Sequence, residues 1–246
     1  MTRPTRDLLA LSYSVDVSSI AVLVGWVRRG IRPHWIGYAP DSDRWPDTFV
    51  YRPIVDDWLA SVGFPTITDV HTLPSIDDAC ADYFAAHIKA GGKVQRAIGY
   101  DAGPCDSKRG GVQSKGPWDW IYPLREWGWD RARCEKEIAA AGLPVPPKSA
   151  CFYCPSTKPA ELIQLAKRHP HLATRAVVME DRARPKLTKI EGLWGTGVKG
   201  TRGGEKKPGS WRVFFAEHAP EVLPELPEPP EQPPVQPIES PEQEAA

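Results

Sequence analysis

Two cysteines in the second half of the chain have the spacing of a ligand pair. Cys151 and Cys154 lie in the run Lys148-Ser149-Ala150-Cys151-Phe152-Tyr153-Cys154-Pro155. A C-x-x-C turn places two thiolates on one side of a tight loop, close enough to bind one metal ion or one cluster. Cys134 and Cys105 precede this pair and would complete a set of four. We therefore predict that Cys105, Cys134, Cys151 and Cys154 hold either zinc or a [4Fe–4S] cluster.

Two other interpretations of the cysteine pair stay open. A redox pair would need a thioredoxin-like βαβ setting, for which the sequence gives no sign, and the thiols could also carry no ligand. Cys80 lies in a helical pattern and is predicted to be a small buried apolar residue. Lys148 could lower the pKa of nearby thiolates or hold an anionic substrate, or it is a solvated loop lysine.

A second candidate site lies at the N-terminus, where a short apolar strand is followed by a polar loop and a helix. The free N–H groups and the dipole at the start of such a helix attract anions. The alternative is an ordinary helix capped by Ser18 or Ser19. Arg109, which follows a glycine loop, could meet the same anion or be a surface charge. The predicted nucleotide-binding residues are Ser12, Ser14, Val17, Ser18, Ser19 and Arg109.

The pattern along the chain predicts the elements that position these residues. We expect strands at 7–13, 34–39, 66–71 and 94–103, and helices that end near Gly30 and span 48–62 and 76–93. Strands that alternate with helices predict an α/β fold, a parallel sheet with helices on both faces. Ligands of such sheets bind at the carboxyl ends of the strands. The loops 14–19, 39–47 and 101–109 would lie on that edge.

Composition divides the chain into four parts. We expect an α/β core at 1–117 and a Trp/Pro-rich helical segment with the C-x-x-C site at 118–194, with helices near 130–141 and 159–168. A Gly/Lys-rich segment follows at 195–218. Residues 219–246 contain seven glutamates, nine prolines and neither lysine nor arginine, and are predicted to be a disordered tail.

Charge and hydropathy limit the possible partners. Because the whole chain is formally neutral, residues 1–218 carry a charge of +7. Two basic runs, Arg182 to Lys189 and Lys199 to Lys207, could contact nucleic acid, although solvated charge is the simpler explanation. The longest apolar stretch, Ile20 to Val27, is too short to cross a membrane, and no signal peptide is recognisable, so we expect a cytoplasmic protein.

The N-terminal segment LSYSVDVSSIAVL resembles the pyrophosphate-binding loop (PP-loop) of the adenine nucleotide α-hydrolase superfamily, which includes ATP pyrophosphatases and PAPS reductases. Ser14 and Ser19 match the pattern S-G-G-x-D-S. Val15 and Asp16 stand where glycines belong, and Ser18 where an acidic residue belongs. Side chains at the glycine positions would obstruct phosphate, and Asp16 adds a like charge.

The run from 122 to 162 gives the more specific resemblance. YPLREWGW and GLPVPPKSACFYCP are similar to the C-terminal half of phage and mobile-element proteins that resemble PAPS reductase. This resemblance implies a cluster held by Cys134, Cys151 and Cys154 beside a nucleotide pocket that takes ATP or PAPS. Trp127 and Trp129 are predicted to pack this segment against the sheet instead of stacking on a base.

Three functional hypotheses follow from these patterns. The first is a PAPS reductase-like oxidoreductase or nucleotide-dependent sulfurtransferase that acts in sulfur transfer or nucleic-acid modification. The second is a non-catalytic relative with a structural metal site, serving as a binding or scaffold protein in a phage-encoded complex. The third is a zinc-stapled scaffold without a small ligand. No cysteine follows Cys154, so the mobile C-terminal nucleophile of PAPS reductases is missing.

Overall fold

The computed structural model describes residues 7–40, 42–71, 75–104, 106–196 and 208–224. The chain divides into two compact units, Met1–Phe152 and Tyr153–Ala246, which we describe separately. Among the described residues, no helix is long and apolar enough to cross a membrane.

The first unit is built on a five-stranded sheet in which every pair of neighbours is parallel. The strand order is β3-β2-β1-β4-β5, with β1 in the centre. This confirms the predicted α/β class. The strands are β1 (Leu8–Tyr13), β2 (Trp35–Tyr38), β3 (Ile67–Asp69), β4 (Val94–Ala97) and β5 (Trp118–Ile121).

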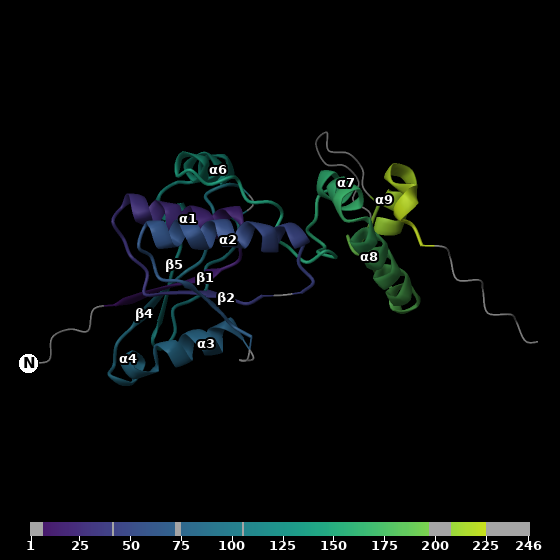
Figure 1. Ribbon diagram of the computed structural model, residues 1–246. Coiled ribbons are helices and arrows are strands. Elements are labelled where there is room, and N and C mark those ends of the chain that lie inside the picture. Colours follow the sequence, from purple (N-terminus) through teal and green to yellow (C-terminus); the bar gives the residue numbers. More distant parts are fainter. Residues whose placement is uncertain (1–6, 41, 72–74, 105, 197–207, 225–246) are drawn as a thin grey trace, which may run out of the picture. The chain divides into compact units, whose positions relative to one another are not determined.

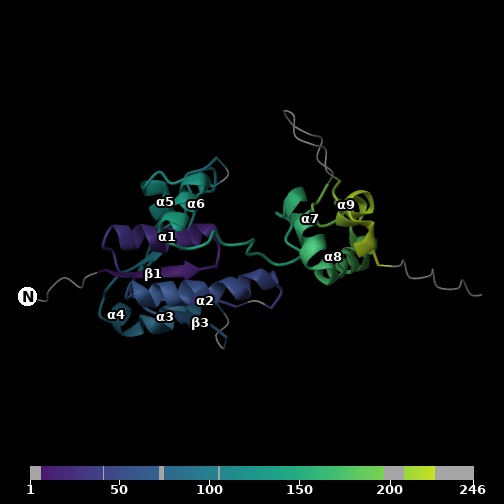
Figure 2. The same cartoon turned by 45° about the horizontal axis from the view of Figure 1, so that its top comes forward.

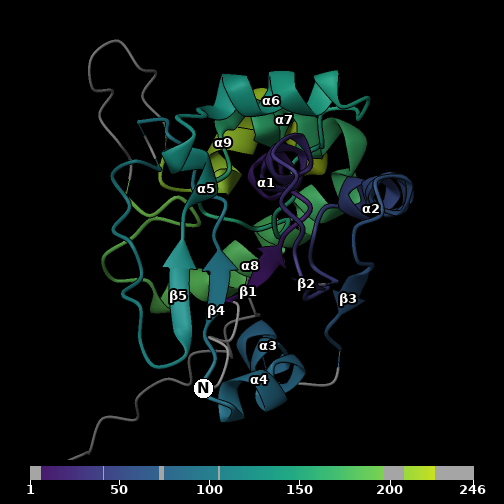
Figure 3. The ribbon, with the colours of Figure 1, turned by 90° about the vertical axis from the view of Figure 1, so that its left-hand side faces the viewer.

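Helices cover both faces of the sheet, as predicted (Figure 1 and Figure 3). One face carries α1 and α2 with α5 and α6 beside α1 (Figure 2), and the other carries α3 and α4. The helices are α1 (Val17–Arg28), α2 (Pro46–Ser61), α3 (Ile76–Tyr83), α4 (Ala85–Lys89), α5 (Pro123–Glu126) and α6 (Arg131–Ala140).

Helix α1 is the centre of the larger core. Its residues from Val17 to Trp26 are all buried, because the sheet covers one side and α5 and α6 cover another. Gly25 lies against the ring of Trp127, which a Cβ atom would strike. The rings of Trp127 and Trp129 lie edge to face with their centres 5.2 Å apart, so both tryptophans pack in this core.

The opposite face holds a smaller core around Trp35, Phe84 and Cys80. Cys80 is completely buried, which confirms its prediction as a small apolar residue. Arg96 on β4 is also buried and forms an ion pair with Asp77 at 2.6 Å. Its guanidinium lies 4.5 Å from the ring centre of Trp120 on β5, which compensates part of the lost hydration.

Three predicted boundaries differ from the structure. The fourth strand ends at Ala97 instead of reaching Gly103, and the predicted helix 76–93 is divided at Phe84. The predicted disordered tail begins too early, because Val222 is buried and the carbonyl of Val222 accepts a hydrogen bond from Thr174 at 2.7 Å. Residues 225–246 and 197–207 lie outside the described residues.

The second unit is helical. Proline begins α7 (Pro159–Arg168), where the helix was predicted, and also begins α8 (Pro170–Ala183), since its fixed φ suits a first helical residue. The short η1 (Arg184–Lys186) continues α8, and α9 (Trp211–His218) is followed by η2 (Pro220–Val222). The aromatic core of this unit consists of Trp194, Trp211, Phe214 and Phe215.

Glu180 of α8 organises this core as a buried acceptor. The residue is only 2% exposed. It accepts hydrogen bonds from the N–H groups of Leu193, Trp211 and Arg212 at 2.7, 2.9 and 3.1 Å, and from the Ser210 hydroxyl at 2.5 Å. A carboxylate at the start of α9 also interacts favourably with the positive end of the helix dipole. Glu180 therefore joins α8, the 192–195 turn and α9.

We predict that Glu180→Gln destabilises the second unit by about 2–4 kcal/mol, because the amide replaces an acceptor of several buried donors. Urea unfolding followed by tryptophan fluorescence measures the loss. Glu217→Gln, at an exposed site on α9, is the matched control and should cost less than about 0.5 kcal/mol. Equal stability of Glu180→Gln and the wild type would contradict this role.

Candidate functional site

The loops after β1 and β4 meet at the carboxyl edge of the sheet. β1 and β4 are neighbours, and their connections lead to strands on opposite sides, which is where parallel sheets form a ligand crevice. Gly99, just after β4, touches the start of α1. A Cβ atom on Gly99 would lie 3.0 Å from the carbonyl carbon of Ser18. A side chain at this position would separate the two loops.

The loop between β1 and α1 is closed by its own side chains. Asp16 is the N-cap of α1, and its carboxylate accepts the N–H of Ser19 at 2.7 Å. The Ser19 hydroxyl accepts the N–H of Asp16 at 3.3 Å, which completes a capping box. The predicted caps, Ser18 and Ser19, are wrong by two or three residues, since both lie in the first turn. The N–H groups of Val17 and Ser18 form no hydrogen bond within the described part of the chain.

Val15 has an unusual backbone conformation. Its φ is 57°, and no other non-glycine residue in the described ranges has a positive φ. A β-branched side chain is strained there, at a cost of about 1–3 kcal/mol. The side chain is completely buried in the core around α1, and this packing compensates for the strain. The backbone of this loop thus keeps a turn that suits glycine, although the residue is valine.

The segment with the first C-x-x-C cysteine lies against the same loop. Ser149 donates its hydroxyl proton to the Ser14 carbonyl at 2.6 Å, and Arg44 donates to both Ser14 and Ser149, at 3.3 and 3.1 Å. Residue 151 pairs with Arg44 in an antiparallel bridge. Arg44 belongs to the predicted edge loop 39–47. The structure therefore brings together the loops after β1 and β2 and the segment 149–152.

The cysteines have different environments. Cys134 on α6 is completely buried among apolar residues, and this burial raises the pKa of its thiol to about 12. Cys151 is half-buried in the first unit, and Cys154, in the second, lies 3.0 Å from the Ser156 hydroxyl. Cys105 lies outside the described residues. Within those residues, no three His, Cys, Asp or Glu side chains are grouped to hold a metal, so the four-cysteine site stays a prediction.

Three other predicted site residues, Ser12, Arg109 and Lys148, have different surroundings. Ser12 points to the α3 side of the sheet, where its hydroxyl accepts a hydrogen bond from Arg96 at 3.1 Å. Arg109 forms an ion pair with Asp106 and lies 5.2 Å from the ring centre of Tyr100. Lys148 is half-buried immediately before Ser149.

An aromatic pair at the carboxyl edge escaped the sequence analysis. Tyr100 follows β4 and Tyr122 follows β5, and their rings stack at 5.9 Å with an interplanar angle of 23°. Arg125 lies about equally close to both rings and donates to the carbonyl of Arg109 at 2.9 Å. Tyrosines that follow two adjacent parallel strands share one edge, but β5 was not predicted, so the strand ends could not indicate this pair.

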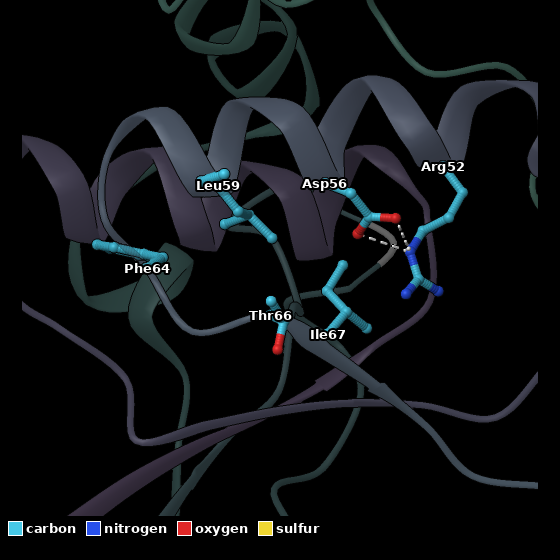
Figure 4. A pocket seen from close by; sticks show the side chains of 7 residues that line it. Arg52, Asp56, Leu59, Phe64, Thr66 and Ile67 are labelled. Carbon is cyan, nitrogen blue, oxygen red and sulfur yellow. Dashed lines mark hydrogen bonds and ion pairs between the residues drawn. The ribbon is translucent and has the colours of Figure 1, made fainter.

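A small cavity of about 280 Å³ lies away from this edge, between α2 and the start of β3 (Figure 4). Its lining is mostly apolar, with Leu59, Phe64 and Ile67. Arg52 at its end is already paired with Asp56 and Asp69, each at 2.9 Å. The charge of Arg52 is therefore satisfied within the chain, and we assign no ligand to this cavity.

The thiol of Cys80 supplies a pH-dependent test of the fold. Burial raises its pKa to about 11, so the unfolded chain loses this proton first and alkaline pH favours unfolding. We predict that raising the pH from 7 to 10 costs the wild type about 1.4 kcal/mol through this thiol, and that Cys80→Ala avoids this part of the loss. Urea unfolding at both pH values measures it. At pH 7, the difference in unfolding free energy between the wild type and Cys80→Ala gives the packing lost by the substitution. If this difference is the same at pH 10, the prediction is contradicted.

Comparison with known proteins does not identify a family. No family model matches the chain, and no curated protein sequence matches it. The function of the chain is therefore inferred from the arrangement of its residues.

Proposed function

We propose that this protein is a non-catalytic relative of the adenine nucleotide α-hydrolases that acts as a binding protein in a larger complex. The observation that supports this proposal is the position of Asp16. Its carboxylate accepts the hydrogen bond of the Ser19 N–H group at the start of α1, where a nucleotide phosphate would otherwise bind.

The energies favour a closed loop. A phosphate would have to displace the Asp16 cap, which costs about 1 kcal/mol. It would also meet a negative charge, and two unit charges about 4 Å apart repel by about 1–4 kcal/mol between water and a protein surface. Together these terms weaken binding by about one and a half to three and a half orders of magnitude. A nucleotide that binds a normal loop with a Kd of about 1 μM would then bind with a Kd of about 30 μM to 3 mM.

An active enzyme is the second candidate, and two observations favour it. The turn at Val15 keeps the left-handed conformation, and the N–H groups of Val17 and Ser18 have no hydrogen-bond partner within the described residues. Arg44 beside Ser14 also adds a positive charge to the loop. In this candidate, ATP or PAPS binds above Ser14, and the cysteine segment contributes sulfur or electron chemistry.

Thermal unfolding with added nucleotide separates the two candidates. We predict that about 1 mM ATP or PAPS stabilises the wild type by less than about 2 kcal/mol, which corresponds to a Kd above about 30 μM. For Asp16→Asn, the added nucleotide should raise Tm measurably, because asparagine keeps the helix cap and removes the negative charge that repels phosphate. Asp47→Asn, near the start of α2, is the matched control for the charge change. Stabilisation of the wild type by about 2.7 kcal/mol, the value for ligand at a hundred times Kd, would favour the enzyme.

We also propose that the cysteine pair holds a metal or a cluster, on the C-x-x-C spacing and the resemblance of residues 122–162. Bound to thiolates, a [4Fe–4S] cluster would supply electron transfer, and zinc would supply a structural link. We predict about four iron and four sulfide, or about one zinc, per chain purified without oxygen. Cys151→Ser should lose this content and Cys80→Ser should keep it. Metal-free wild-type protein would contradict the proposal.

A further inference from the structure

The second unit carries a row of cations along α8 and its continuation. Arg175, Arg182 and Lys186 are separated by seven and four residues, which places them on one side of a helix of 3.6 residues per turn. All three side chains are exposed, and so is Lys189, which follows η1. We call these four residues the basic face.

The acidic residues of α8 do not neutralise Arg182, Lys186 or Lys189 of the basic face. Glu180 is buried and accepts hydrogen bonds from the start of α9. Asp181 binds Arg212 through both carboxylate oxygens, at 2.9 and 2.6 Å. Within the described residues, Arg182, Lys186 and Lys189 form no ion pair. The carboxylates of the helix are thus used inside the unit, and the charges of Arg182, Lys186 and Lys189 are left at the surface.

The shape of the basic face indicates what it binds. Long, solvated side chains hold a single phosphate only weakly, whereas a polymer of phosphates adds several weak contacts and releases counterions at each. Insertion into a membrane would need an exposed apolar face, but Leu172 and Val177 of α8 are buried, and Met179 is its only exposed large apolar side chain. We propose that the basic face binds the phosphate backbone of a nucleic acid. This proposal concerns the second unit alone and does not depend on the state of the loop after β1.

The test uses the full chain and a fluorescent DNA of about 20 nucleotides, single-stranded or duplex, with anisotropy measured over a range of salt concentrations. Arg182→Glu combined with Lys186→Glu should weaken binding at least about tenfold near 0.1 M salt. The slope of log K against log salt should become shallower by about 1.4–1.8, because two phosphate contacts are lost. If the double reversal reduces the helical content, Arg182→Ala with Lys186→Ala should give a smaller loss in the same direction.

The matched control is Lys89→Glu combined with Lys136→Glu, two exposed lysines of the first unit with the same change in net charge. It should keep most of the affinity. An equal loss in both double variants would overturn the proposal, because the effect would then come from net charge alone. Failure of the wild type to bind DNA would overturn it as well.

The acidic C-terminal segment provides a competing occupant. It carries six glutamates between 225 and 246, and it follows Val222, which is hydrogen-bonded to α8 at Thr174. Replacing these glutamates by glutamine should leave DNA binding within about threefold of the wild type if nucleic acid occupies the basic face. Binding that occurs only after this replacement would overturn the proposal and make the segment the occupant in the full chain.

Discussion

The burial of α1, apart from its last two residues, is the constraint on which the first unit depends. Ten consecutive residues of this helix, from Val17 to Trp26, are buried. The sheet, α5 and α6 must therefore cover it from different sides, and Gly25 must stay small where Trp127 crosses it. The position of α1 in turn fixes the loop after β1, because the first turn of a buried helix cannot move without disturbing this core.

A buried helix start also needs acceptors for its N–H groups, since water cannot supply them. In a phosphate-binding protein the ligand fills that role when it is present. In this chain Asp16 fills part of it permanently, and Val15 anchors the preceding turn in the core. The two side chains thus act together: Asp16 caps the helix start, and Val15 packs the preceding turn into the core. Both stabilise the loop in a single conformation.

Strong local signals made part of this structure predictable. The apolar run before Ser14 predicted β1, and proline at position 159 marked the start of α7. β5 was missed because it has only four residues, all half-buried, so neither length nor alternation identified it. The pattern of 76–93 suits one helix, but the chain turns at Phe84 to bury that ring. The site was harder still. The capping box of Asp16 and Ser19 is local and could have been read from their spacing of three residues, but the predicted caps were Ser18 and Ser19 instead. The contact of Arg44 with Ser149 depends on how distant loops meet, and nothing in their local sequence encodes this.

The second unit shows how internal capping shapes a surface. A carboxylate is expensive to bury, and Glu180 is stable inside only because four donors from the turn before α9 and from α9 itself surround it. Asp181, one residue later, is held by Arg212 from the same helix. These contacts connect α8 to α9, and they also remove two negative charges from the neighbourhood of Arg182 and Lys186. The same interactions that fold the unit therefore leave its outer face positive, so that stability and surface charge in this unit have a common origin.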